Sequence, residues 1–166
     1  MPDLEKLLQR LIENQVEFVI VGGYAAIAHG VTLTTFDVDV CSPLTFENLE
    51  KIHTSLTGLR PYHRETPQEI PFVMPDDFKR NLRNLYLHTD LGQIDFLGEI
   101  LGVGDYASVF RQSQVAELPF GQCRILDCAA LLKAKEATAR PKDLLAAQML
   151  RAILESSSGS THKPHD

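Results

Sequence analysis

The sequence feature that most constrains the fold is a strictly alternating hexapeptide, FDVDVC, at residues 36–41. Alternation with a period of two is typical of a β-strand with one apolar face. Side chains two positions apart on a strand point to the same side. The pattern therefore predicts a strand that holds Asp37 and Asp39 next to each other and directs Val38 and Val40 into the core.

Two neighbouring carboxylates at the edge of a buried sheet repel each other, because each raises the pKa of the other. A divalent cation between them removes this conflict. Carboxylate oxygens are the ligands that Mg²⁺ prefers, and substrate phosphates commonly complete its octahedron. A solvent-facing strand end with two aspartates would show the same pattern. Asp37 and Asp39 are therefore candidate ligands for Mg²⁺ or Mn²⁺.

A glycine pair precedes the aspartates. The apolar run FVIVGG, residues 18–23, predicts a short buried strand that ends in a tight turn. Glycines there let backbone N–H groups approach an anion, and the helix expected after them offers its positive N-terminus. A glycine pair alone is common in turns. Together with the aspartates, however, Gly22 and Gly23 predict a phosphate site beside a metal site.

A third acid, Asp95, lies in the β-type run QIDFLGE, with Ile94 and Phe96 on the opposite face. A carboxylate among such apolar neighbours is costly unless it is paired or binds a metal. If its strand lies beside the strand of Asp37, all three acids converge. Asp95 then ligates metal and accepts the proton of an attacking hydroxyl. The alternative is an aspartate that faces solvent.

The remaining patterns predict a small mixed β-sheet flanked by helices, of the α/β (α+β) class, with further helices at the C-terminus. Two hairpins are expected, one joined at Leu91-Gly92 and one turning at Gly121. Residues 60–80 contain four prolines and predict a long irregular loop. Helices are expected at residues 3–14, 24–30, 45–57, 104–111, 127–139 and 141–155.

Length and composition favour one domain over residues 1–155, with a core at about 15–112, a C-terminal hairpin and helices at 113–155, and a disordered tail at 156–166. No apolar run approaches the roughly 20 residues of a membrane span, and the charged N-terminus is not a secretory signal. A cytoplasmic protein is therefore expected, with its three cysteines as apolar fillers. The net charge of −6 argues against broad nucleic-acid binding.

The arrangement VGG-x13-DVD, followed by a later strand aspartate, resembles the DNA polymerase β-like nucleotidyltransferase superfamily. It is most similar to the small bacterial branch that includes AbiEii-type toxins of abortive-infection and toxin–antitoxin systems. Members of that branch often carry a later K-x4-R-P-K-D stretch. Here Lys135, Arg140, Pro141, Lys142 and Asp143 stand at that spacing. The resemblance covers roughly residues 4–152.

The resemblance implies a nucleotidyltransferase-like fold and an enzyme that moves a nucleoside monophosphate from an NTP, such as ATP, to an acceptor hydroxyl. The acceptor is a protein side chain, a tRNA end or a small molecule. The implied metal ligands and catalytic residues are Asp37, Asp39 and Asp95. The implied nucleotide-binding residues are Gly22, Gly23, Thr35, Lys135 and Asp143. Without the motif, Lys135 and Asp143 would be ordinary residues of a solvated helix face or first helical turn.

Three positions depart from the pattern of the branch. Leu33 stands where an arginine is common, Ala146 where a second acid is common, and Ala139 where a glycine is common. These departures leave open a catalytically degenerate module that binds nucleotide or a protein partner. A phosphate-binding regulatory domain of unrelated ancestry is a third reading, and it predicts that the three aspartates do not converge. Basic residues in and after the proline-rich loop either contact substrate or face solvent: Arg60, His63, Arg64, Lys79, Arg80 and Arg83.

Overall fold

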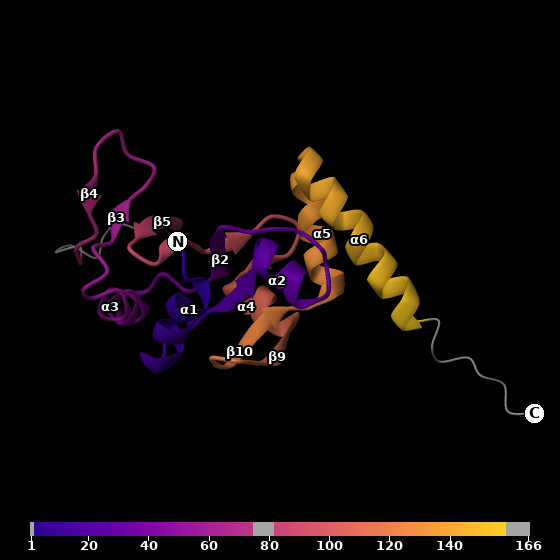
Figure 1. The fold of residues 1–166 in the computed structure, drawn as a ribbon, viewed down its shortest axis with the longest axis horizontal. Coiled ribbons are helices and arrows are strands. Elements are labelled where there is room, and N and C mark those ends of the chain that lie inside the picture. The colour runs from indigo at the N-terminus through magenta and orange to yellow at the C-terminus, as the bar shows by residue number, and fades with distance from the viewer. Residues whose placement is uncertain (1, 75–81, 159–166) are drawn as a thin grey trace, which may run out of the picture.

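A computed structural model describes residues 2–74 and 82–158 of the chain. It contains an eight-stranded mixed sheet with the order β4-β3-β5-β6-β2-β1-β10-β9 and a separate two-stranded sheet, β7-β8 (Figure 1). The strands are β1 (Val19–Val21), β2 (Asp37–Cys41), β3 (Tyr62–His63), β4 (Ile70–Pro71), β5 (Asn84–Thr89), β6 (Gly92–Leu97), β7 (Glu99–Ile100), β8 (Gly104–Asp105), β9 (Ser113–Leu118) and β10 (Gly121–Leu126). This architecture confirms the predicted mixed-sheet α/β class.

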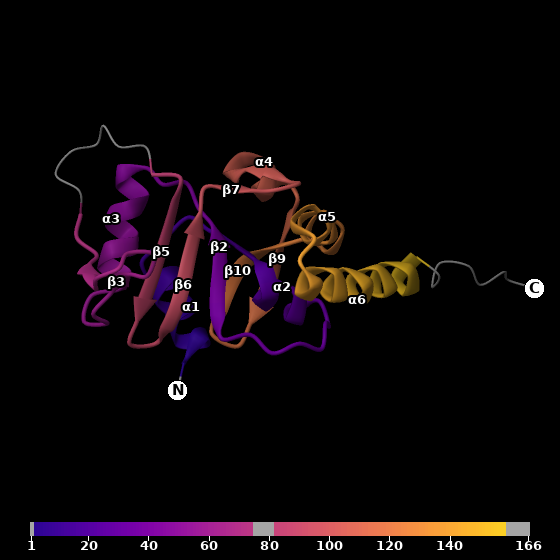
Figure 2. The same cartoon turned by 90° about the horizontal axis from the view of Figure 1, so that it is seen from above.

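Helices pack around the large sheet. The helices are α1 (Leu4–Glu13), α2 (Gly22–Ala28), α3 (Phe46–Ser55), α4 (Tyr106–Arg111), α5 (Cys128–Thr138) and α6 (Pro141–Ser158). α1 packs against α3, and α5 packs against α6. Figure 2 shows α5 and α6 beside the β9–β10 side of the sheet, with α6 projecting away from it. Within the described residues, no helix combines the length and apolar character needed to cross a membrane.

β2 occupies the centre of the sheet. It pairs antiparallel with β1 and parallel with β6, and its Asp39 stands opposite Asp95 in the register. Val38 and Val40 have no exposed surface, as the alternating pattern predicts. The parallel β2–β6 pair therefore brings the third acid next to the first two, because residues in register on adjacent strands share a face.

The proline-rich stretch differs from its prediction. Residues 60–80 do not form one irregular loop, since β3 and β4 make a short antiparallel pair that continues the sheet beyond β5. Pro71 is tolerated in β4 because that strand lies at the edge, where a missing N–H donor leaves no ladder bond unmade. Residues 75–80 of the predicted loop lie outside the described part of the chain.

The C-terminal helices follow their predicted boundary signals. The Asp127 side chain caps α5 by accepting a hydrogen bond from Ala130 N, and Pro141 occupies the first position of α6. α6 continues beyond the predicted end at Glu155, so residues 156–158 of the expected disordered tail are helical. The rest of that tail, residues 159–166, lies outside the described residues. The three cysteines are free, and Cys41 and Cys123 are buried.

Ala139 ends α5 in a left-handed conformation, with φ of 50°. A side chain in this region costs about 1 kcal/mol, whereas glycine adopts it freely. Because Ala139 is exposed, its methyl group loses little packing when removed. Ala139→Gly is therefore expected to raise the free energy of unfolding by about 0.5 kcal/mol in urea denaturation. Ala152→Gly, at an exposed interior position of α6, should lower it by about 1 kcal/mol. A lower free energy of unfolding in both variants would contradict the expectation.

Candidate functional site

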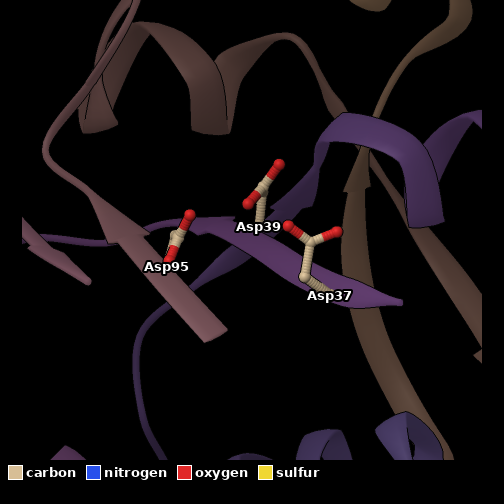
Figure 3. Close-up of side chains that lie close together, drawn as sticks. All are labelled: Asp37, Asp39 and Asp95. Atoms are coloured by element: carbon tan, nitrogen blue, oxygen red, sulfur yellow. The ribbon is translucent and has the colours of Figure 1, made fainter. Parts of the chain in front are cut away.

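Three aspartates meet at the centre of the sheet. Asp37 and Asp39 extend from β2 and Asp95 extends from β6, and Figure 3 shows the three carboxylates grouped above these strands. One oxygen from each side chain lies within 4.8 Å of the others. This convergence contradicts the reading of an unrelated regulatory domain, which requires the acids to lie apart. Carboxylates at such separations can share a divalent cation.

The electrostatics of the site favour a cation. Burial, followed by the charges of Asp37 and Asp95, raises the pKa of Asp39 from 3.8 to about 7, although Lys135 and Arg64 oppose the shift. Asp95 is 8% exposed, and its Oδ1 is buried without a hydrogen-bond partner. Close carboxylates and an unsatisfied buried oxygen fit a hard divalent metal such as Mg²⁺ or Mn²⁺, which takes oxygen ligands.

Gly22 forms one wall of this acidic site. Its φ of +66° is a conformation that favours glycine, and a Cβ at this position would lie 2.5 Å from Oδ2 of Asp39. A Cβ on Gly23 would lie 3.2 Å from Oγ1 of Thr35. The glycine pair thus permits close packing of the β1–α2 turn against the aspartates. The close approach of Asp39 explains why position 22 requires glycine, and the sequence did not reveal this requirement.

Thr35 contacts the first aspartate. Its Oγ1 lies 3.1 Å from the carbonyl oxygen of Asp37 and 3.2 Å from Oδ1 of the same residue. A hydroxyl has one hydrogen to donate, so Thr35 donates to one of these acceptors at a time. Thr35, which the resemblance assigns to nucleotide binding, therefore also restrains the Asp37 carboxylate.

A cleft of about 280 Å³ opens beside Asp39 and Gly22. Lys135 and Arg140 also line it, so it combines acidic and basic groups. Apolar side chains complete its walls: Leu97, Ile100, Leu101 and Leu131. Such a mixture suits a ligand with a charged part and an apolar part. A larger cavity of about 600 Å³, beside Tyr62 of β3, is lined by Arg60 but by none of the predicted metal-binding or nucleotide-binding residues.

Asp143 connects the two C-terminal helices. It is 1% exposed and accepts hydrogen bonds from Arg140 Nε at 2.6 Å and Thr138 Oγ1 at 2.9 Å, while Lys135 Nζ lies 3.4 Å from its Oδ1. Burial would raise the pKa of Asp143. The hydrogen bonds and the charges of Lys135 and Arg140 outweigh burial and lower the pKa to about 2.

Asp143 does lie in the first turn of α6, as the alternative reading expected, but it is buried there and paired with cations. The Lys135 side chain is 14% exposed, so it does not lie on a solvated helix face. Asp143 orients two cations that line the cleft. Arg140 was part of the recognised motif, but its position in the cleft was not predicted. The conformation of Arg140 depends on its ion pair with Asp143, and the sequence pattern did not show that Asp143 is buried.

Arg64 was predicted only as one of several basic residues that contact substrate or face solvent, and its contact with Asp95 was not predicted. Its guanidinium contacts both oxygens of Asp95, with Nη2 donating to Oδ2 at 2.9 Å and Nη1 lying 2.8 Å from Oδ1. The Nη1 contact lacks hydrogen-bond geometry, so Oδ1 has a charge partner but no hydrogen bond. Other members of the predicted basic cluster behave differently: Arg60 pairs with Asp90 at the surface, and residues 79 and 80 lie outside the described chain.

A substitution of Asp39 tests the electrostatic conflict. In metal-free protein at pH 8, Asp39→Asn is expected to raise the free energy of unfolding by on the order of 2 kcal/mol, because it removes one of three repelling charges. It should also abolish Mn²⁺ binding. The folded pKa, about 7, lies above the ordinary 3.8. The parent should therefore lose stability as the pH rises from about 4 to 7, and the advantage of the variant should appear over that range.

Urea denaturation in EDTA at several pH values measures this difference. Asp90→Asn is the control, since its carboxylate accepts three hydrogen bonds from Arg60 rather than facing other acids. It should bring no gain in stability at any pH. An Asp39→Asn protein that is no more stable than the parent at pH 8 would contradict the proposed repulsion.

Comparison with known proteins adds one finding. No family model and no curated protein matches the sequence. Among solved structures, the chain is similar to a Thermotoga maritima protein provisionally named a nucleotidyltransferase, with 16% identity, a TM-score of 0.50, and coverage of 92% of this chain and 91% of that chain. The chain therefore has a nucleotidyltransferase fold. The likeness gives no support to the narrower AbiEii-type branch.

Proposed function

We propose that the protein is a metal-dependent nucleotidyltransferase that transfers a nucleoside monophosphate from an NTP to an acceptor hydroxyl. The observation that carries this proposal is the convergence of Asp37, Asp39 and Asp95 within 4.8 Å. Asp39 of this cluster lines a cleft that Lys135 and Arg140 also line. Acids to bind metal and cations to bind phosphate thus lie together on a nucleotidyltransferase fold.

Asp37 and Asp39 would hold Mg²⁺ or Mn²⁺ together with the triphosphate, while Thr35 restrains Asp37. When bound, the metal would neutralise phosphate charge and polarise the α-phosphorus. Lys135 and Arg140 would bind phosphate oxygens, and Gly22 and Gly23 would leave space for the phosphates. Lys142 lines a narrow cleft with Lys135 and Gly23, which adds positive charge near the glycine turn.

Asp95 would accept the proton of the acceptor hydroxyl. The acceptor oxygen then forms a bond to the α-phosphorus as the bond from that phosphorus to the bridging oxygen breaks. Pyrophosphate leaves, and Lys135 and Arg140 stabilise its developing charge. Asp143 would act on the nucleotide through the two cations that it orients.

The proposed biological role rests on the resemblance in sequence, which leaves three classes of acceptor open. We propose a cytoplasmic, single-domain protein over residues 1–155, with a role in a toxin–antitoxin or abortive-infection system. ATP is the first NTP to examine. A protein side chain, a tRNA end and a small molecule are the acceptor classes to compare.

A second function is a catalytically degenerate module that binds nucleotide or a protein partner. It is supported by the departures at Leu33 and Ala146. Ala146 is 2% exposed, so an acid at this position would have to be buried. Nucleotide binding without turnover distinguishes this function from the first.

The proposal is tested by incubating the protein with each α-labelled NTP, Mg²⁺ or Mn²⁺, and each acceptor class, and by following label transfer and pyrophosphate release. Asp37→Ala/Asp39→Ala should lose metal-dependent NTP binding and transfer, whereas Asp90→Ala, at an exposed ion pair, should retain them. Calorimetry with NTP and Mn²⁺ measures binding directly. Absence of metal-dependent NTP binding in the parent would overturn the proposed function.

A further inference from the structure

Arg64 is held between the short outer strands and the acidic site. It follows β3, and its backbone N–H donates to the carbonyl oxygen of Tyr86 in β5 at 3.0 Å. Its guanidinium lies over the Tyr86 ring, 5.7 Å from the centroid, and the side chain is 24% exposed. The backbone bond and the ring contact fix the direction in which the guanidinium points.

That direction is toward Asp95. The two terminal nitrogens of Arg64 contact the two carboxylate oxygens at 2.8 and 2.9 Å, an arrangement close to a bidentate pair. Nη1 also lies 3.4 Å from Oε1 of Gln93, and Glu65 adds a longer contact at 3.8 Å. The carboxylate of Asp95 is therefore already engaged by a permanent cation of the same chain.

The same carboxylate belongs to the acidic cluster. Oδ1 of Asp95 is buried and makes no hydrogen bond, so the guanidinium satisfies this oxygen incompletely. Asp37 and Asp39 have no comparable ion pair among the contacts of the described residues. Within the described part of the chain, a divalent cation at the cluster thus finds two carboxylates without an ion pair and one that is shared with Arg64. Two cations that approach one carboxylate repel each other, and each weakens the binding of the other.

We propose that Arg64 is a positioning residue that competes with the metal for Asp95, an inference that rests on the proposed function. In the resting protein, Asp37 and Asp39 form the open part of the metal site, and Arg64 restrains Asp95. Oδ1 would be the oxygen of Asp95 available to a cation, because Oδ2 accepts the hydrogen bond from Nη2 and Oδ1 accepts none. Asp95 then remains oriented toward the acceptor hydroxyl.

Mn²⁺ titration of the nucleotide-free protein tests this competition, with free Mn²⁺ measured by electron paramagnetic resonance. Arg64→Gln is expected to tighten Mn²⁺ binding about tenfold, because it removes the competing charge. Arg64→Lys retains a charge beside Asp95 but loses the two-pronged contact, so it should fold and tighten binding about threefold. Arg60→Gln is the matched control, since Arg60 makes a similar but exposed contact with Asp90, and it should leave Mn²⁺ affinity unchanged.

A second measurement separates competition at Asp95 from the general field of the arginine. In an Asp95→Asn background, Arg64→Gln should change Mn²⁺ affinity less than twofold. Urea denaturation in EDTA shows that each variant is folded. If Arg64→Gln does not fold, Arg64→Lys decides the matter alone.

Each outcome has one meaning. Tighter Mn²⁺ binding in the Arg64 variants, or binding in these variants when the parent shows none, supports the inference. Equal or weaker binding in the variants overturns it and leaves the proposed function intact if the parent binds Mn²⁺. An equal gain in the Asp95→Asn background also overturns it. Absence of Mn²⁺ binding in the parent and in all Arg64 variants overturns this inference, whereas the proposed function is decided by metal-dependent NTP binding.

Discussion

Gly22→Ala is expected to abolish Mn²⁺ binding and to lower the free energy of unfolding by about 3 kcal/mol. Two effects add. The φ of +66° costs a side chain about 1 kcal/mol, and the new Cβ would lie 2.5 Å from Oδ2 of Asp39. Because Asp39 lies beside Asp37 and Asp95, moving its carboxylate distorts the whole cluster. Urea denaturation in EDTA and Mn²⁺ titration measure the two losses.

Gly58 provides a matched control for this substitution. Its φ is +81°, and a Cβ there would meet no atom within 4 Å. Gly58→Ala should therefore show the backbone cost alone, about 1 kcal/mol, and should bind Mn²⁺ like the parent. Equal losses of stability in the two variants, with Mn²⁺ binding retained in both, would show that the contact between Gly22 and Asp39 has no role in the site.

Asp143→Asn is expected to lower the free energy of unfolding by about 3 kcal/mol and to weaken NTP binding at least tenfold. The substitution leaves the partly buried Lys135 without its counter-charge, and an unpaired buried charge is strongly destabilising. It also releases Arg140, which then samples other rotamers. Thermal denaturation and calorimetry with NTP and Mn²⁺ measure the two effects.

The control for Asp143→Asn is an exposed ion pair that joins the same two helices at the surface. Glu136 of α5 pairs with Arg151 of α6, and the two side chains are 44% and 52% exposed. Glu136→Gln should cost less than about 1 kcal/mol, because exposed ion pairs contribute little. Similar losses from Asp143→Asn and Glu136→Gln would contradict a special role for the buried acid.

The loss of stability in Asp143→Asn is expected to depend on pH. The folded pKa of about 2 lies below the ordinary 3.8, so the ionised Asp143 stabilises the fold at pH values above about 4. That stabilisation is lost as the pH falls toward 2. The difference in stability between parent and Asp143→Asn should therefore be greatest above pH 4 and should shrink below it.

Much of the acidic site could be predicted from the sequence because strand geometry is periodic. The alternation at residues 36–41 placed Asp37 and Asp39 on one face, and the apolar neighbours of Asp95 placed it on a strand. That this strand lies beside β2 was only a condition of the prediction, and the β2–β6 pairing meets it. Asp127 and Pro141 similarly marked the starts of α5 and α6, whereas α6 ends three residues later than predicted. These signals lie within a few residues of the element that they predict, so they can be recognised in the sequence without knowledge of tertiary contacts.

Other features depend on contacts that no local pattern reports. β3 and β4 are too short to show alternation, and they form because β5 offers a free edge. Arg64 lies 31 residues from Asp95, and nothing in its neighbourhood distinguishes it from Arg60. The burial of Asp143 depends on how α6 packs against α5. The role of Gly22 likewise becomes visible only when the turn lies against Asp39.

The parallel register of β2 and β6 decides which side chains of β2 stand beside Asp95. A slip of one residue along β2 would exchange its two faces, so that valines would stand beside Asp95 and carboxylates would enter the apolar interior. Such a misfolded chain would be destabilised, because it would bury carboxylates without a counter-charge. The aspartates therefore disfavour a slipped strand alignment, and the native register is the one that groups the three carboxylates.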